Sequence, residues 1–549
     1  MKNNNLILII ARASGTKEVS RQNLRLVNGK PLLFYILKTS LSCKNCSTFV
    51  STDSDEIEAY SKFYGAETIK RPKQLTKDQT TLEDIAIDAL KKLIKKGFSF
   101  KKCLIIHPHF PLIKKQTINR FFSKLDKKIW VISGFENESK SGRHFAYFKK
   151  DNKHSRLIQI PNHVVEIKKI VSFDCETLLN RKKFENKIYG LEISKEEIFS
   201  PSNYHDFASL ESMMNRKKII VRVDGDKNIG LGHVYNMLTI LNNMRNEDIL
   251  ILMNVKKNLG YKKFKEHLYN VKFFSNSTQL WKHIDEFKPD IIFNDILSTT
   301  SNYVRNLKSR GIFVVNFEDL GIGRKYADLV FNPIFENKKQ LKNEFYGSKY
   351  ACVREEFRIF KRKALTKKVK KIGITFGGVD KKNNTCKVLS IINQFQILKN
   401  IEIEVILGLG YMHKNKLDKI IKKMKDKDYK INFTERADML SKHLADCDFV
   451  ITSNGRTVFE LAALEIPIIS LSVNQREKQH NFVKESCVGF NIDFSKNSSG
   501  VILKRNIDKM MDISARKKFT KNLHKEDLLK GIDRVTSKIL LEYNKTKRQ

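Results

Sequence analysis

The chain has 549 residues, of which 41% are hydrophobic, and its formal net charge is +43. This length is too great for one ordinary hydrophobic core, so we expect about two to four domains. The charge would permit binding to nucleic acid, but the lysines are spread along the whole chain, without a zinc-finger spacing or a compact basic arm. We therefore expect a lysine-rich surface that favours anionic nucleotide ligands, and no nucleic-acid partner.

Short apolar strands alternate with helical patterns along the chain, which predicts an α/β protein with largely parallel sheets. In the first part we expect strands at 6–11, 48–51, 104–107 and 130–133, and helices at 31–40, 54–63 and 81–95. After a break at 215–218, strands are expected at 219–223, 249–253, 291–294 and 311–316. Beyond a lysine-rich connector, the third set lies at 372–376, 403–407, 449–452 and 467–471. We therefore assign three domains, 1–215, 216–360 and 361–549.

The location of the protein is predicted from apolar runs and cysteines. The apolar run at 6–10 is too short for a signal-peptide core, and no run approaches the length of a membrane span. The eight cysteines are scattered, and only Cys43 and Cys46 form a C-x2-C pair, which is weak evidence for a metal site. We expect a cytoplasmic protein without disulfides or a membrane span. The sequence does not decide between a monomer and a homo-oligomer.

The first domain carries a basic loop directly after its first strand, and the sequence then reads NLRLVNGKP. Two cationic side chains in such a loop can offset the charge of a nucleotide triphosphate. The segment resembles the acylneuraminate cytidylyltransferase family, which couples CTP to a nonulosonic acid and has a GT-A-like fold. The matching pieces are ARASGTKEVSRQNLRLVNGKPL, VSTDSDEI and HPHFPL. The resemblance implies a CTP site made of Arg12, Lys17, Arg21, Asn23 and Lys30.

This domain departs from the family where the metal is bound. The family carries two aspartates that hold catalytic magnesium, and Ser200 and Ser202 occupy those positions here. A neutral hydroxyl is a poor substitute for a hard anionic ligand. His107 also stands where the family uses a substrate-contacting glutamine. We predict weak or absent cytidylyl transfer, and Mg²⁺ is expected only if the domain is active.

In the second half, a glycine turn joins a strand to a helix. Gly230-x-Gly232-His233 follows the strand at 219–223 and precedes an apolar run at 234–241. A helix N-terminus offers free N–H groups and a positive dipole end, which suit a phosphate. A histidine there can exchange a proton near neutral pH. These features predict chemistry on a nucleotide-linked substrate.

Further polar groups end neighbouring strands of this half. Arg222 and Asp224 end its first strand, and the pairs Asn294-Asp295 and Glu318-Asp319 end later ones. In the third domain, glycine turns again lead into helices, and their residues are Gly377, Gly378, Asp380, Asn454, Gly455, Thr457 and, one turn on, Glu460. Strand ends of two lobes commonly hold a ligand between them. A carboxylate there can accept ribose hydroxyls while the turns take phosphate.

Residues 219–535 resemble the UDP-sugar hydrolases of pseudaminic acid synthesis, which have a GT-B-like fold and release UDP from a 2,4-diacetamido-2,4,6-trideoxyhexose. The matching pieces include RVDGDKNIGLGHV, NFEDLG, TFGGVD and SNGRTVFELAALEIPIISLSVNQ. The resemblance implies that His233 is the base for water attack at C1, without a metal or cofactor, and that Arg222 and Asp224 line the sugar side. It implies that UDP is held by Gly377, Gly378, Thr457 and Glu460, with Asn474 and Gln475 closing over it. The glycine turns themselves add Gly230, Gly232, Asp380, Asn454 and Gly455 to the predicted nucleotide site.

One position departs from this second family. The family has an arginine three residues after the histidine, as in GHxxR, and this chain has Asn236. The missing charge bears on the rate or the sugar specificity, and Lys227 or Arg456 is a candidate for replacing it. The leading hypothesis is a two-part sugar-nucleotide enzyme of nonulosonic acid biosynthesis, with a UDP-amino sugar and possible CTP and nonulosonic acid as ligands.

Other functions fit parts of the same pattern. A GT-B-type glycosyltransferase would pass the sugar to an acceptor in place of water, and a nucleotide-sugar-binding module would bind UDP without turnover. Each site residue also has a purely structural interpretation. His233 could be a packed or capping histidine, Glu460 a solvated helix carboxylate, and Asp380 an N-cap that also binds ligand. The stereochemistry of the sugar depends on the shape of the pocket.

Overall fold

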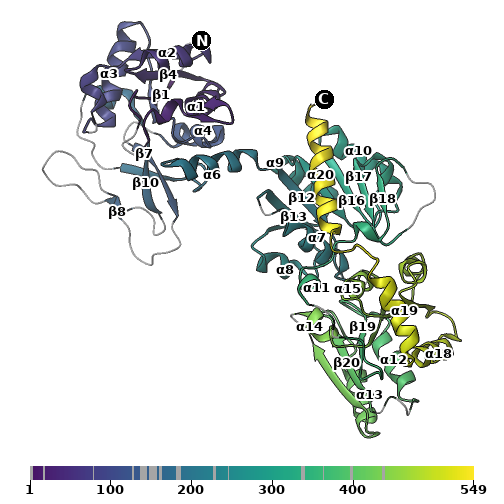
Figure 1. The fold of residues 1–549 in the computed structure, drawn as a ribbon. Coiled ribbons are helices and arrows are strands. Elements are labelled where there is room, and N and C mark those ends of the chain that lie inside the picture. The colour runs from purple at the N-terminus through teal and green to yellow at the C-terminus, as the bar shows by residue number, and fades with distance from the viewer. Residues whose placement is uncertain are drawn as a thin grey trace. The chain divides into compact units, whose positions relative to one another are not determined.

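The computed structural model describes residues 4–15, 19–77, 79–125, 129–136, 145–146, 158–159, 164–180, 187–226, 230–244, 246–335, 341–360, 362, 364–395, 398, 400–435 and 439–548. The chain divides into two compact units, Met1–Asn215 and Arg216–Gln549 (Figure 1). Among the described residues, no helix is both long and apolar enough to cross a bilayer.

The first unit is built on a seven-stranded sheet in the order β11-β7-β10-β6-β1-β4-β5. Strand β10 is antiparallel to both of its neighbours, and the other pairs are parallel. The strands are β1 (Asn5–Ile10), β4 (Cys46–Thr52), β5 (Glu67–Lys70), β6 (Lys102–Ile106), β7 (Ile129–Glu136), β10 (Val164–Asp174) and β11 (Lys187–Glu192). Two short pairs accompany it, β2 (Leu26–Val27) with β3 (Lys30–Pro31), and β8 (Phe145–Ala146) with β9 (Ile158–Gln159).

Helices cover both faces of this sheet, and strand β1 shows why. Leu6 and Leu8 of β1 belong to one core cluster, whereas Ile7 and Ile9 belong to another. Because successive side chains of a strand point to opposite faces, a continuous apolar run is buried on both sides. The helical segments are η1 (Gln22–Leu24), α1 (Leu32–Leu41), α2 (Asp55–Phe63), η2 (Lys73–Thr76), α3 (Leu82–Lys95), α4 (Lys115–Lys124), α5 (Cys175–Leu179) and α6 (Tyr204–Asn215).

The second unit contains two parallel sheets, each of which defines a lobe. The first lobe has the strand order β14-β13-β12-β15-β16-β17-β18, and every pair is parallel. Its strands are β12 (Lys218–Val223), β13 (Asp248–Asn254), β14 (Asn270–Phe274), β15 (Ile291–Asp295), β16 (Phe313–Phe317), β17 (Leu329–Asn332) and β18 (Glu344–Tyr346). Its helical segments are α7 (Gly232–Leu241), α8 (Tyr261–Glu266), α9 (Ser277–Phe287), α10 (Ser301–Ser309), η3 (Ile322–Tyr326) and η4 (Ser348–Tyr350). The next helix, α11 (Glu356–Ile359), packs against helices of the second lobe.

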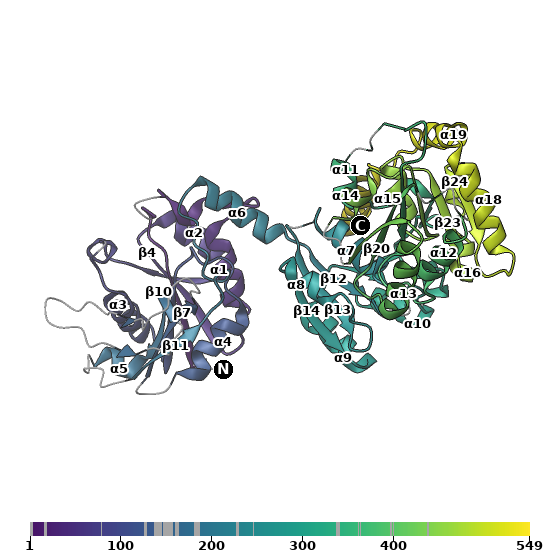
Figure 2. The same cartoon turned by 90° about the horizontal axis from the view of Figure 1, so that it is seen from below.

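The second lobe has the parallel order β21-β20-β19-β22-β23-β24. Its strands are β19 (Lys371–Thr375), β20 (Glu402–Leu407), β21 (Lys430–Glu435), β22 (Phe449–Ser453), β23 (Ile468–Ser472) and β24 (Gly489–Asp493). Its helices are α12 (Asn384–Ile392), α13 (Lys414–Lys425), α14 (Leu440–Leu444), α15 (Thr457–Ala463), α16 (Gln475–Lys478), α17 (Phe482–Glu485), α18 (Ser499–Met511) and α19 (Ile513–Leu523). Figure 2 shows α12 and α13 beside β20.

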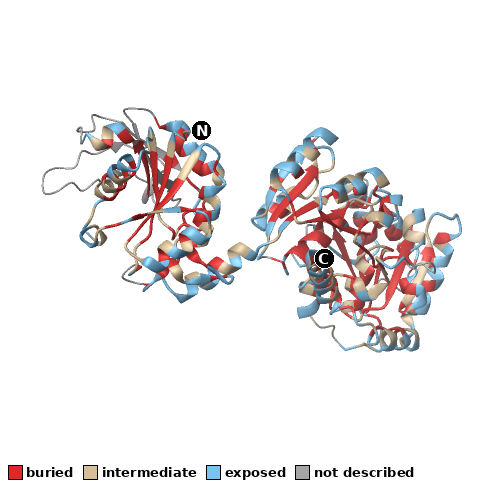
Figure 3. Cartoon of the chain, turned by 90° about the horizontal axis from the view of Figure 1, so that it is seen from above, coloured by how far each residue is buried: buried red, intermediate tan, exposed pale blue. Residues whose placement is uncertain are grey.

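The last helix, α20 (Gly531–Arg548), returns from the second lobe to the first. Val535, Ile539 and Tyr543 join the core of the first lobe, and the Tyr543 hydroxyl donates to Asp290 at 3.1 Å. The chain therefore crosses between the lobes twice, and α20 ties its end to the sheet that began the unit. Figure 3 shows the buried strands at the centre of each sheet and the exposed positions on the outer helices.

The strand orders fix where a ligand can bind. In the first lobe the order reverses between β12 and β15, and in the second between β19 and β22. In open α/β sheets, ligands bind outside the carboxyl ends of the strands at this reversal. The predicted strands that flank both reversals are confirmed, each within two residues at its ends. Asp224, Asp380 and Asn454 follow three of these strands, and Asp295 ends the fourth. Glu318 and Asn474 instead follow the neighbouring strands β16 and β23.

Candidate functional site

A histidine and an aspartate meet at the strand reversal of the first lobe. His233 stands in the first turn of α7, and its Nδ1 is hydrogen-bonded to Oδ1 of Asp295, the last residue of β15. The His233 side chain is 7% exposed and that of Asp295 is fully buried. A carboxylate on Nδ1 selects one tautomer and leaves Nε2 as the nitrogen that can take a proton.

Asn236, one turn further along α7, holds the other oxygen of the same carboxylate. Its amide Nδ2 donates to Asp295 Oδ2 at 2.7 Å. Burial alone would raise the pKa of Asp295, but His233, Arg456 and Asn236 together hold this pKa below its ordinary value. Asp295 is therefore an anion that can stabilise a protonated imidazole.

Arg222 and Asp224 lie at the end of β12, next to this pair. Arg222 stacks over the rings of Tyr303, at 4.5 Å from the centroid, and Phe274, at 5.6 Å. Asp224 is 4% exposed and accepts from Lys257 Nζ at 3.1 Å. The buried Arg222 Nε and Asp224 Oδ1 have no hydrogen-bond partner among the described residues. A polar ligand would supply partners for both, which fits the predicted sugar side.

A carboxylate of the first lobe is held by two arginines of the second. Glu318 Oε1 lies 2.7 Å from Arg456 Nη2, and its Oε2 lies 3.2 Å from Arg476 Nη2. Glu318 is 3% exposed and has a φ of 51°, in the left-handed region that is costly for a side-chain-bearing residue. These contacts join the lobes at the end of β16.

The glycine turns of the two lobes approach each other. Gly377 has a φ of 68°, which a residue with a Cβ adopts only with strain. A Cβ on Gly378 would stand 3.0 Å from the Cβ of Leu231, so the residue that precedes α7 packs against the turn after β19. Gly230 has a φ of 84°, and a Cβ on Gly232 would lie 3.7 Å from Arg456 Cδ.

Asp380 accepts hydrogen bonds from the start of α12 with both carboxylate oxygens, while Asn383 is the N-cap residue of that helix. Oδ1 accepts from Asn384 N at 2.7 Å, and Oδ2 accepts from Thr385 N at 2.9 Å and Thr385 Oγ1 at 2.7 Å. Asp380 therefore bonds to the first helical turn without being its N-cap residue, and a contact with nucleotide stays a prediction.

Asn454, in the loop that follows β22, forms hydrogen bonds with the segment before α17. Its Nδ2 donates to the carbonyls of Glu477 and His480, at 2.8 and 2.7 Å. His480 is 1% exposed, and burial lowers its pKa to about 4. Its ring is therefore neutral at pH 7, and Nδ1 lies 3.1 Å from the Asn454 carbonyl.

The remaining predicted UDP residues lie around this loop. Gly455 precedes α15, Thr457 begins it, and Glu460 accepts from Arg354 Nε at 2.7 Å. Glu460 is thus a paired carboxylate, 13% exposed, and the solvated interpretation does not describe it. Asn474 caps α16 by accepting from Glu477 N at 2.9 Å, and Gln475 begins that helix with an exposed side chain.

In the first unit, three of the predicted CTP residues share one loop. Arg12 follows β1, Arg21 N donates to Ser14 O at 3.0 Å, and Asn23 Nδ2 donates to Arg12 O at 3.0 Å. The Arg21 side chain pairs with Glu56 and is 61% exposed. Lys30 stands apart on β3, with its ammonium 5.9 Å from the Phe34 ring centroid. Lys17 lies outside the described residues.

The positions of the missing magnesium ligands pack against this loop. Gln22 Nε2 donates to the Pro201 carbonyl at 2.6 Å, which brings Ser200 and Ser202 close to it. Ser202 Oγ donates to Asp206 Oδ2 at 2.6 Å, so the hydroxyl is already hydrogen-bonded to a carboxylate in the first turn of α6. Within the described ranges, no cluster of three His, Cys, Asp or Glu residues could hold a metal ion. The hydroxyls do not fit a magnesium site of the family's type.

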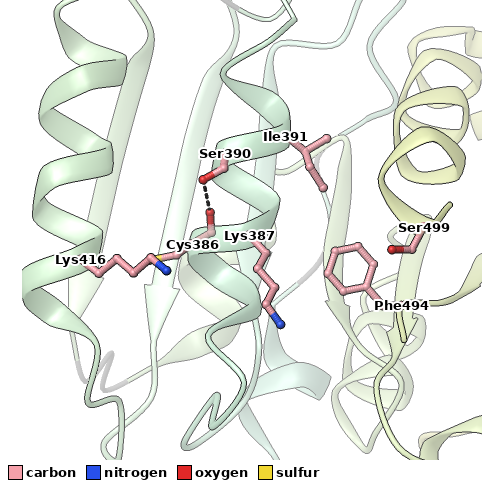
Figure 4. Close-up of a pocket in the computed structure, with 7 residues that line it drawn as sticks. All are labelled: Cys386, Lys387, Ser390, Ile391, Lys416, Phe494 and Ser499. Carbon is pink, nitrogen blue, oxygen red and sulfur yellow. Dashed lines mark hydrogen bonds between the residues drawn. The ribbon is translucent and has the colours of Figure 1, made fainter. Parts of the chain in front are cut away.

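A pocket of about 350 Å³ lies apart from these residues, on the outer side of α12 (Figure 4). It is lined by Cys386, Lys387, Ser390, Ile391, Lys416, Phe494 and Ser499. Ser390 Oγ donates to the Cys386 carbonyl at 2.8 Å, and both lysines are exposed. Exposed lysines alone do not define a ligand site, and we assign no function to this pocket.

Comparison with known proteins bears chiefly on the first unit. Residues 6–165 match the family model described as cytidylyltransferase. The chain is 30% identical over 115 residues to CMP-N,N′-diacetyllegionaminic acid synthase of Legionella pneumophila, which covers 21% of this chain and 50% of that enzyme. Residues 6–165 form a cytidylyltransferase-like domain. The resemblance predicted from the basic loop is confirmed to this extent.

Two further matches each cover a larger share of the chain than that domain does. The chain is 32% identical over 286 residues to an uncharacterized protein of Methanocaldococcus jannaschii, covering 49% of this chain and 58% of that protein. The Anabaena protein HepE, solved with UDP and glucose, aligns at 11% identity and a TM-score of 0.40, over 59% of this chain and 99% of that one. The chain thus spans 58% and 50% of the two curated relatives named here.

Several site residues were missed by the sequence or left without a role. Asp295 was noted only as a strand end, and its contact with His233 spans 62 positions. Arg476 and His480 belong to none of the motifs that the sequence analysis singled out. Lys227 lies outside the described residues, whereas Arg456 does reach Asn236, with Nη1 donating to Oδ1 at 2.6 Å.

Proposed function

We propose that the second unit hydrolyses a UDP-linked 2,4-diacetamido-2,4,6-trideoxyhexose and releases UDP, in the biosynthesis of a nonulosonic acid. The observation that carries this proposal is the His233–Asp295 pair at the strand reversal of the first lobe. A GT-B-like arrangement, with the sugar beside the first lobe and UDP beside the second, is part of the proposal.

In this mechanism, His233 Nε2 takes a proton from water as the water oxygen attacks C1 of the sugar. The bond between C1 and the β-phosphate oxygen breaks, and UDP leaves with the electron pair. Asp295 stabilises the imidazolium that forms, as an orienting carboxylate does in other histidine-based sites. The free N–H groups at the start of α7 and the turn at Gly377 and Gly378 favour the charge that develops on the diphosphate.

The first unit is proposed to bind CTP through Arg12, Lys17, Arg21, Asn23 and Lys30, with little transfer to a nonulosonic acid. The loss of both magnesium-binding aspartates supports this low activity, because Ser200 and Ser202 supply no negative charge. The chain would then join a nucleotide-sugar hydrolase to a domain related to the later activating step.

The first experiment follows UDP release by phosphorus NMR, with the full-length protein and UDP-2,4-diacetamido-2,4,6-trideoxyhexoses. We expect His233→Ala to lower the rate by about 100- to 10,000-fold. His524→Ala is the control, because that side chain is 57% exposed and belongs to the same unit. It should keep the wild-type rate.

Two outcomes would contradict hydrolysis. Release that rises when an alcohol acceptor is added, with the sugar recovered on that acceptor, would identify a glycosyltransferase. Tight UDP binding with no release under any condition would identify a binding module. Equal rates for wild type and His233→Ala would remove His233 as the base.

A further inference from the structure

One cation of the second lobe contacts the residues that hold the proposed base. Arg456 is the N-cap residue of α15 and directly follows the Asn454-Gly455 turn. Its Nη1 donates to Asn236 Oδ1 at 2.6 Å, and its Nη2 lies 2.7 Å from Glu318 Oε1. The side chain is only 16% exposed. Both of its contacts lie in the other lobe.

These bonds converge on the Asp295 carboxylate, which accepts from Asn236 on one oxygen and from His233 on the other. Arginine can only donate, and an ionised carboxylate can only accept, so the Asn236 amide has one orientation that satisfies both neighbours. Its oxygen faces Arg456, its nitrogen faces Asp295 Oδ2 at 2.7 Å, and Asp295 Oδ1 holds His233 Nδ1. The bonds from Arg456 to Asn236 and from Asn236 to Asp295 run in one sense, and together they fix the orientation of the carboxylate that accepts from His233.

We propose that Arg456 is a positioning residue that acts through Asn236 and Asp295 to hold His233 in its reactive tautomer. The inference rests on the proposed base role of His233. The resembling family places an arginine three residues after this histidine, on the same helix. Here the cation comes from the opposite lobe, so the site is completed only where the two lobes meet.

The arrangement couples the nucleotide turn to the base. Arg456 is part of the segment proposed to hold UDP, while Asn236 and His233 share α7. A ligand that fixes the conformation of the turn after β22 also fixes the position of Arg456. Through Asn236, Arg456 then orients the Asp295 carboxylate that holds His233. UDP-sugar binding would then complete the catalytic geometry in the first lobe.

A competing role for Arg456 is direct contact with the diphosphate. Its buried Nε has no hydrogen-bond partner in the part of the chain that the structure describes. A phosphate ligand for this arginine predicts weaker UDP binding on its removal. A positioning role predicts a lower turnover rate and a changed imidazole, with UDP affinity nearly unchanged.

The test compares Arg456→Met with Arg476→Met in full-length protein labelled with ¹⁵N-histidine. Arg476 is the matched control because it also contacts Glu318, with Nη2 at 3.2 Å from Oε2 and 2.9 Å from the backbone carbonyl, and no contact with Asn236 is described. The ring nitrogen shifts of His233, assigned with His233→Gln, report the tautomer without any turnover. UDP affinity is measured by calorimetry, and kcat and KM by UDP release.

For Arg456→Met we expect the His233 ring shifts to move toward a tautomer mixture and kcat to fall by about 10- to 100-fold. The UDP dissociation constant should stay within about threefold. Arg476→Met should leave the ring shifts as in wild type. The double variant Asn236→Arg with Arg456→Met restores a cation from α7, and we expect it to recover part of kcat.

Unchanged ring shifts in Arg456→Met would overturn the proposal, whatever happens to the rate. A loss of UDP affinity that matches the loss of rate, with the ring unchanged, would assign Arg456 to the diphosphate. If wild type released no UDP, hydrolysis would fail, yet the ring shifts would still decide whether Arg456 positions His233.

Discussion

At the residue scale, the site of the second unit contains buried charges whose partners come from distant parts of the chain. Asp295 is fully buried, and such a carboxylate would ordinarily become neutral. It is held as an anion because His233, Arg456 and Asn236 surround it. A buried anion of this kind stabilises a positive charge on its partner, which is what a general base requires after it takes a proton.

His480 shows the opposite behaviour, and it makes the stability of the fold depend on pH. Burial lowers its pKa to about 4 in the folded protein, against ~6.5 for an exposed histidine. Between these values the unfolded chain binds a proton that the folded chain does not. Stability therefore rises with pH in this window and is lost as the pH falls from about 6.5 toward 4.

We expect acidification from pH 7.5 to 5 to cost the second unit about 2 kcal/mol through His480. Removing the titration with His480→Gln should flatten the pH dependence of the unfolding free energy by that amount. Urea denaturation at several pH values measures it, and His524→Gln controls for an exposed histidine. Parallel pH curves for His480→Gln and wild type would contradict the buried neutral ring.

At the element scale, the start of α12 separates a structural role from a ligand role. Asp380 accepts three hydrogen bonds from Asn384 and Thr385, and it has a φ of 42°, in the left-handed region. Asp380→Ala loses these three hydrogen bonds and strains the backbone, so we expect a loss of about 2 kcal/mol. Asp380→Asn should lose less, because asparagine tolerates this φ and still offers an acceptor.

Urea denaturation of full-length Asp380→Ala and Asp380→Asn gives the two stabilities, and calorimetry with UDP gives the affinities. If Asp380 acts only on the helix, Asp380→Asn should bind UDP almost as wild type does. Asp380→Ala should then lose UDP affinity only to the extent that it destabilises the nearby turn. A large loss of affinity in a stable Asp380→Asn would show direct contact with the nucleotide.

Burial explains only part of what the sequence located and missed, because the inner strand β17 was also missed although its four residues are all buried. Strands β1, β12, β15, β19 and β22 are continuous apolar runs that lie inside their sheets, and the sequence located all of them. Edge strands β14 and β21 were not predicted, because few of their residues are buried: two of five in NVKFF and one of six in KINFTE. A half-exposed edge strand needs no long apolar run, so its pattern resembles a polar loop.

The candidate site was predictable only where one segment carries the signal. Turns such as Gly230-x-Gly232-His233 join a strand to a helix locally, so their place in the sheet follows from the pattern. The contact between Arg456 and Asn236 spans 220 positions and depends on how two lobes meet. The sequence indicated a missing cation at Asn236, but that Arg456 reaches this residue became visible only in the fold.

At the scale of the whole molecule, three sheets each place polar loops at a strand reversal. The first unit has Arg12 after β1 and His107 after β6, and the second unit repeats the arrangement in both lobes. The two units have separate cores and separate candidate sites. The two proposed ligands, CTP and a UDP-sugar, would therefore contact residues that share no element.

This separation predicts that the two chemistries can be altered independently. With full-length protein, CTP, a nonulosonic acid and Mg²⁺, we expect little pyrophosphate release, because Ser200 and Ser202 are neutral. Ser200→Asp with Ser202→Asp should raise Mg²⁺-dependent release at least about tenfold. The new carboxylate at 202 would stand beside Asp206, since Ser202 Oγ now lies 2.6 Å from Asp206 Oδ2.

UDP release should be the same in this double variant and in wild type, and His233→Ala should leave pyrophosphate release unchanged. Pyrophosphate is measured by a coupled assay and UDP by phosphorus NMR on the same samples. Fast pyrophosphate release by wild type would show that the domain binds Mg²⁺ with other groups and would overturn its assignment as weakly active. A fall in UDP release in the double variant, with the second unit still folded, would show that the two sites communicate.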